Sequence, residues 1–65
     1  NPVNDVLFVE GNDVDKIEIY TIVGKKLLST TKKVIDMKSY DQGIYMIHIY
    51  NVNNELISIN KAVKK

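Results

Sequence analysis

Ser29, Asp36 and His48 are the residue types of a hydrolytic triad. A serine nucleophile also needs an orienting base, an oxyanion hole and a sharp turn that exposes its hydroxyl. No nucleophile elbow surrounds Ser29. The chain therefore predicts no catalytic residues, and we expect no enzyme.

Metal and cofactor sites are not expected either. His48 is the single histidine, and the chain has no cysteine. Metal binding needs several converging ligands, and no His-x-x-x-His or cysteine cluster occurs. The three glycines lie far apart at expected turns, which is not the pattern of a phosphate-binding loop.

The length and the net charge of the chain exclude further classes of function. Sixty-five residues make one domain at most. The net charge is +1 with both signs mixed, so we expect no nucleic-acid partner. The one basic concentration is the end, Lys61-Ala62-Val63-Lys64-Lys65. No apolar run is long enough for a membrane helix, and no signal peptide opens the chain. We expect residues 1–65 to be a single domain of a longer secreted protein.

Short β-forming runs alternate with turn residues along the whole chain, which is typical of a sandwich or a barrel. We expect strands over residues 5–9, 16–22, 26–30, 34–37, 43–50 and 55–63. So many strands in so short a chain need two layers to bury their apolar faces. The predicted fold is all-β, a small antiparallel sandwich of six to seven strands, and a five- or six-stranded barrel is the alternative.

Alternation with period two assigns faces to these strands. Ile17 and Ile19 share one face, and Glu18 and Tyr20 share the other. Three further predictions concern burial. Tyr45, Ile47 and Ile49 form the core face of their strand, Ile57 and Ile59 are core residues, and the apolar run over residues 6–9 is buried on both sides.

Three motifs follow one another in a recognisable order. Asn1-Pro2 precedes a short apolar strand, Ile17-Glu18-Ile19-Tyr20 precedes a turn at Gly24, and Gly43-Ile44-Tyr45 opens a strand. Together they resemble the type A C-terminal sorting domain of the type IX secretion system, also called the Por secretion system, of Gram-negative Bacteroidetes. The resemblance covers nearly the whole chain.

Two further positions bear on this resemblance. Lys61 and Lys65 match the Lys-x-x-x-Lys spacing with which the family ends, whereas Asp41 stands where the family often has proline. This difference from the family pattern affects the expected conformation of the loop before Gly43.

The resemblance implies an immunoglobulin-like β-sandwich and the role of an address label without a reaction of its own. It implies that an N-terminal cargo crosses the inner membrane with an ordinary signal peptide and folds in the periplasm. Translocon, shuttle and sortase components at the outer membrane would then act on the label. The cargo would reach the cell surface or the medium, and the label would be cleaved upstream of Asn1.

Candidate recognition residues follow from the same resemblance. They are Gly43, Tyr45, Lys61, Lys64 and Lys65, with Asn1 and Pro2 as the domain-start motif. Each group also has a structural interpretation. Gly43 and Tyr45 suit a turn and a core tyrosine, the lysines suit a frayed solubilising tail, and Asn1-Pro2 suits a linker.

The sequence leaves a second class of function open. Tyr20 and Tyr50, with Met46, could form an aromatic strip on one sheet face. Such a strip would suit a carbohydrate-binding or adhesive module of a surface protein, and packing between sheets is the structural alternative.

Overall fold

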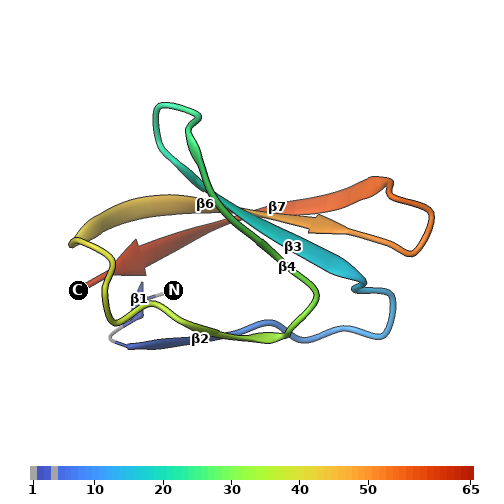
Figure 1. The fold of residues 1–65 in the computed structure, drawn as a ribbon, viewed down its shortest axis with the longest axis horizontal. Coiled ribbons are helices and arrows are strands. Elements are labelled where there is room, and N and C mark those ends of the chain that lie inside the picture. Colours follow the sequence, from blue (N-terminus) through green and yellow to red (C-terminus); the bar gives the residue numbers. More distant parts are fainter. Residues whose placement is uncertain (1, 4) are drawn as a thin grey trace.

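The computed structural model describes residues 2–3 and 5–65. They form strands, turns and loops only (Figure 1). The seven strands are β1 (Pro2–Val3), β2 (Val6–Phe8), β3 (Lys16–Thr21), β4 (Lys26–Thr30), β5 (Val34–Asp36), β6 (Gly43–Tyr50) and β7 (Leu56–Lys64). Within these residues, no helix is long and apolar enough to cross a membrane.

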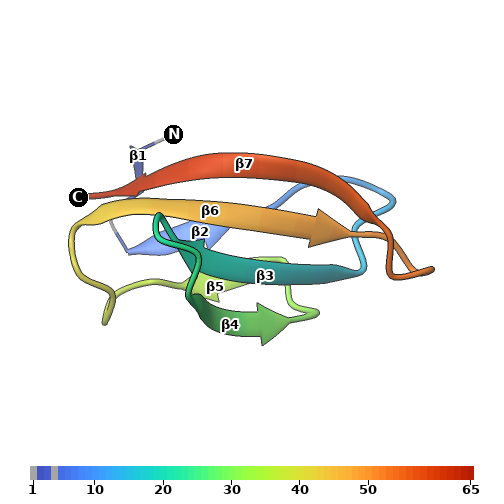
Figure 2. The ribbon, with the colours of Figure 1, turned by 90° about the horizontal axis from the view of Figure 1, so that it is seen from above.

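The strands make two sheets of unequal size. The larger has the order β1-β7-β6-β3-β4, and the smaller is the β2–β5 ribbon. Figure 2 shows β7, β6, β3 and β4 side by side, with the ribbon behind them. All pairs are antiparallel except β1 with β7, which is parallel. The predicted small β-sandwich of six to seven strands is confirmed.

The core lies between the two sheets. Its fully or nearly buried members are Ile17, Ile19, Ile35, Met37, Tyr45, Ile47, Ile49 and Ala62. Leu7 and Val9 pack against it from the ribbon side. The predicted core face of β6 is confirmed, because Tyr45, Ile47 and Ile49 alternate with half-buried or exposed neighbours.

The prediction that Ile57 and Ile59 belong to the core is wrong. Ile57 is 46% exposed and Ile59 is 50% exposed. In the β6–β7 ladder, Ile49 lies opposite Ser58 and Tyr45 lies opposite Ala62. Residues that lie opposite one another share a face, so between Ser58 and Lys64 β7 turns its even-numbered residues to the core side, whereas Ile57 lies at a register shift in the ladder. A shift of one residue in register moves a whole apolar set to the other face.

Burial of the first strand on both sides is also wrong. Leu7 faces the core, but Phe8 is 68% exposed and Val6 is 40% exposed. The reason is that β2 lies in the outer ribbon, and no layer of the described residues covers its far face. Backbone bonds from Val9 N–H to Lys33 O and from Met37 N–H to Asp5 O extend this ribbon beyond its regular strands.

The sequence also led to predictions about the two ends of the chain. Asn1 lies outside the described residues. Pro2 begins β1 at the sheet edge, a position that proline tolerates because its missing N–H breaks no internal ladder. Lys61 and Lys64 do not belong to a frayed tail, since β7 runs to Lys64 and pairs with β6 and β1, whereas Lys65 lies beyond the strand.

The immunoglobulin-like assignment stays a prediction. The β2–β5 ribbon faces the sheet that holds β3, β6 and β7. In immunoglobulin-like sandwiches, strands B and E similarly face strands C, F and G.

Candidate recognition site

The Gly-x-Tyr segment forms a corner at the start of β6. Gly43 has φ +152°, a backbone conformation that side-chain-bearing residues rarely adopt. Two residues later, Tyr45 is 7% exposed, and its hydroxyl donates a hydrogen bond of 2.6 Å to the carbonyl of Asp41. A tyrosine near the start of a strand that bonds back to the upstream backbone is a tyrosine corner. Tyr45 therefore holds the preceding loop on the sheet.

Tyr40 completes this corner, and sequence reasoning did not single it out. Its ring centroid lies 5.6 Å from that of Tyr45, and burial raises the pKa of its hydroxyl. A shallow hollow of about 380 Å³ lies beside the two rings, lined by Thr21, Leu27, Ser39, Tyr40, Asp41 and Tyr45. A lone aromatic residue in an otherwise polar loop was the available signal. The Tyr45 ring is mostly buried, so its influence on the surface around the hollow is to determine the shape of that surface.

The structure separates the three lysines. Lys61 is exposed and lies opposite Met46, on the face of the large sheet that points away from the ribbon. Lys64 points to the other face and is only 8% exposed, with Nζ donating to the Lys65 carbonyl at 3.0 Å. Lys65 is exposed beyond the strand. The lysines thus form no single basic patch.

The two candidate motifs nevertheless meet at one end of the sandwich. Gly43 lies directly opposite Lys64, and Tyr45 lies opposite Ala62. Val3 of β1 is paired with Lys64 from the other side. Figure 2 shows this end, where β1, the start of β6 and the C-terminus lie close together.

The outer face of the large sheet carries a buried carboxylate. Glu18 is 6% exposed, and its Oε1 accepts a hydrogen bond of 2.9 Å from the Tyr20 hydroxyl. Its Oε2 lies 3.5 Å from the Nζ of Lys26 and 3.9 Å from that of Lys16. The Tyr20 hydrogen bond is the main reason that the pKa of Glu18 is held below 4.5, and the same bond raises the pKa of Tyr20 to about 12.

The predicted aromatic strip exists, but its rings are partly covered. Tyr20 lies opposite Met46 on the outer face, and its ring centroid is 4.3 Å from that of His48. The Nζ of Lys16 lies 4.4 Å from the centroid of the Tyr50 ring. One face of each tyrosine is therefore already in contact with a neighbouring side chain.

The hypothetical triad does not assemble. Ser29 and His48 both flank Glu18 on the large sheet, whereas Asp36 lies in β5 and accepts a hydrogen bond of 2.9 Å from the Lys38 N–H. In the part of the chain that the structure describes, no three histidine, aspartate or glutamate side chains converge on a metal-sized site.

Comparison with known proteins decides the family. The family described as the secretion system C-terminal sorting domain matches residues 1–65, the whole chain. This protein belongs to that family. Neither the curated proteins nor the solved structures include a match. The resemblance of the ordered motifs to the type IX sorting domain is thereby confirmed.

Acid should destabilise this sorting domain through Glu18. Its folded pKa lies below the ordinary value of 4.5, so its contribution is present above that pH and is lost as the pH falls through the folded pKa. We expect Glu18→Gln to be less stable than the parent at pH 7 and to lose part of the acid sensitivity. Urea unfolding followed by circular dichroism from pH 3 to pH 7 measures both effects. Exposed Glu10→Gln is the matched control; equal pH profiles for the two variants would contradict the prediction.

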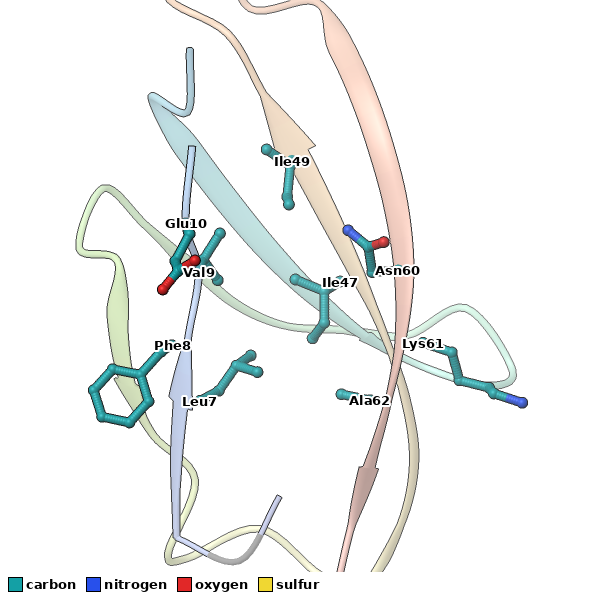
Figure 3. A pocket seen from close by; sticks show the side chains of 9 residues that line it. All are labelled: Leu7, Phe8, Val9, Glu10, Ile47, Ile49, Asn60, Lys61 and Ala62. Atoms are coloured by element: carbon teal, nitrogen blue, oxygen red, sulfur yellow. The ribbon is translucent and has the colours of Figure 1, made fainter. Parts of the chain in front are cut away.

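A groove opens along one side of the sorting domain. It has a volume of about 200 Å³ and is lined by Leu7, Phe8, Val9, Glu10, Ile47, Ile49, Asn60, Lys61 and Ala62. Figure 3 shows Leu7, Ile47 and Ala62 pointing into the space between β2 and β7, while Lys61 points away from it. The groove exists because the narrow ribbon does not reach across the inner face of β7.

Proposed function

We propose that this sorting domain is a non-catalytic label that sends an N-terminal cargo through the type IX secretion system. The single observation that carries the proposal is the meeting of the Gly43–Tyr45 corner with the C-terminal end of β7. A receptor that reads a folded shape can contact both motifs at once only if they share a surface. The family match to a C-terminal secretion sorting domain supports the same role.

In this proposal the domain works by presenting a folded surface to translocon and shuttle components at the outer membrane. The Tyr45 corner holds the loop and the hollow beside it, and Lys61 and Lys65 supply exposed positive charge. The cargo passes through the periplasm to the cell surface or the medium. A sortase then cleaves the chain upstream of Asn1, so the domain needs no reaction of its own.

An export assay tests this function. A signal peptide and a fluorescent reporter are placed before residues 1–65 and expressed in a host with a working type IX system. We expect the reporter at the surface or in the medium, and in the periplasm of a translocon-null strain. Periplasmic retention in the working host, with the domain folded and several natural upstream residues included, would refute the proposal.

The exposed lysines have their own predicted effect. Replacing Lys61 and Lys65 by glutamine should lower export severalfold if an acidic receptor surface binds them. Stability should change by less than about 0.5 kcal/mol, because both side chains are exposed. The double variant with Lys25→Gln and Lys32→Gln removes the same amount of charge from exposed positions that are distant in sequence from the C-terminal end. This control should leave export unchanged. Normal export after Lys61, Lys64 and Lys65 all become glutamine would contradict a role for the basic end.

The carbohydrate-binding alternative has weaker support. Stacking on a sugar needs a free aromatic face, and Tyr20 and Tyr50 each have one face in contact with His48 or Lys16. A glycan array distinguishes the two functions, since a sorting label should bind no glycan on it.

A further inference from the structure

The edge of β7 that points away from β6 is largely unpaired. β7 is nine residues long and pairs with β6 along nearly its full length. On its other side, β1 pairs only with Val63 and Lys64. Within the described residues, no strand lies beside residues 56–62 on that side (Figure 2). An open edge of this length is a template for another strand, because its N–H and C=O groups point outward.

The surroundings of this edge would accept a strand with apolar side chains. The groove beside it has Ile47, Ile49 and Ala62 along the large sheet and Leu7 along the ribbon. Side chains of an added strand alternate between two faces. One set would enter the groove, and the other would lie beside exposed Ile59 on the outer face. The groove side of such a strand would therefore meet apolar surface, and its outer side would lie beside Ile59 and Lys61.

The register in which β1 pairs with β7 shows which segment of the chain could pair with the free edge of β7. Pro2 lies opposite Val63 and Val3 lies opposite Lys64, in parallel. Each step upstream of Pro2 in this register is one step back along β7. A chain that continues β1 upstream would therefore run beside residues 62 to 56, and the third residue before Asn1 would lie opposite Ile59.

We propose that the segment immediately upstream of Asn1 extends β1 as a parallel strand along the free edge of β7. This inference rests on the proposed function, in which the cargo lies upstream of the label. A tethered segment meets the edge at an effective concentration in the millimolar range, so it outcompetes a strand from a separate molecule. The junction between cargo and label is then part of the label's sheet rather than a free linker.

Disulfide trapping in the complete cargo–label protein tests this register. The label contains no cysteine, so Ile59→Cys can be combined with a cysteine at the third residue before Asn1. Neighbouring strands lie about 4.8 Å apart, which suits a disulfide between directly opposite residues. After mild oxidation, proteolysis and mass spectrometry would report the linked peptides. Ile59 is half exposed, so its replacement should leave the fold intact.

Two controls make the result specific. Moving the upstream cysteine by one residue turns it to the other face, and it should cross-link to Ile59→Cys about tenfold more slowly. Pairing the original upstream cysteine with Ser29→Cys, exposed on the far edge strand β4, should give no link. Equal rates for the two upstream positions would indicate a free linker and overturn the proposal. A covalent dimer through Ile59→Cys would overturn it in favour of a second copy on this edge.

The trapping result is independent of export because it is measured on the purified protein. A register-specific cross-link without export of the reporter would leave the strand inference standing and reject the sorting role. Export of the reporter without the cross-link would reject the strand inference and leave the sorting role standing.

Discussion

Replacing Tyr45 by alanine is expected to remove a large part of the domain's stability and to cut export as a result. Truncating a buried aromatic side chain costs about 3–5 kcal/mol. At about 0.05–0.15 kcal/mol per residue, a chain of this length has a total stability of roughly 3–10 kcal/mol. The variant also loses the hydrogen bond from the Tyr45 hydroxyl to the Asp41 carbonyl, which holds the loop on the sheet. Urea unfolding monitored by circular dichroism measures the loss. A Tyr45→Ala domain with the parent's urea midpoint would show that the corner is not structural.

Two companion variants separate folding from recognition. Tyr45→Phe keeps the ring and removes only the hydroxyl, so it should lose about 0.5–1.5 kcal/mol and stay folded. Ile19→Ala removes a fully buried core side chain on the central strand β3 and should lose about 2–5 kcal/mol. If export follows stability alone, Tyr45→Phe will be exported better than Ile19→Ala. If Tyr45→Phe is folded and fails to be exported while Ile19→Ala succeeds, the loop surface is read directly.

Replacing Gly43 by alanine has the second largest expected effect. A side-chain-bearing residue at φ +152° is strained by about 1–3 kcal/mol, although a Cβ at this position would meet no atom within 4 Å. The cost is therefore conformational rather than steric crowding. The relief of this strain would shift the start of β6 against Lys64, its partner in the ladder. We expect a lower urea midpoint and reduced export.

Gln42→Ala is the matched control for Gly43→Ala. Gln42 is the preceding residue, is exposed and carries no positive φ, so its replacement should change stability by less than about 0.5 kcal/mol. Equal midpoints for Gly43→Ala and Gln42→Ala would mean that the turn tolerates a side chain. Gly43 would then have to act in sorting, if at all, by leaving room for a receptor.

The fold class, the family and the approximate positions of six strands could be predicted from the amino-acid sequence alone. These features depend on local patterns. Period-two alternation and turn residues define strands wherever the chain carries them, and the ordered motifs around Ile17, Gly43 and Lys61 identify the family without any knowledge of contacts. The core face of β6 was also readable, because Gly43 and Tyr45 belong to a motif and Ile47 and Ile49 continue its alternation.

The faces of the strands that are buried depend on contacts between distant segments, which no local pattern specifies. Ile57 and Ile59 alternate as a core strand would, yet both are exposed, because Ile59 lies opposite His48 on the outer face and Ile57 lies at a register shift in the ladder. Phe8 is apolar and exposed, because the ribbon that carries it has no layer outside it among the described residues. Glu18 is charged and buried, because side chains from three strands gather around it. Alternation specifies that a strand has two faces, but register and neighbouring layers determine which face is buried.

The same distinction applies to the candidate site. Gly43, Tyr45 and the C-terminal lysines were predicted one by one, and the pairing of β6 with β7 brought their segments to one end and sent Lys61 and Lys64 to opposite faces. The parallel strand β1 was not predicted, because two residues that begin with proline carry no recognisable strand pattern. Its pairing depends on a partner some sixty residues away in the chain, a contact that no local pattern specifies.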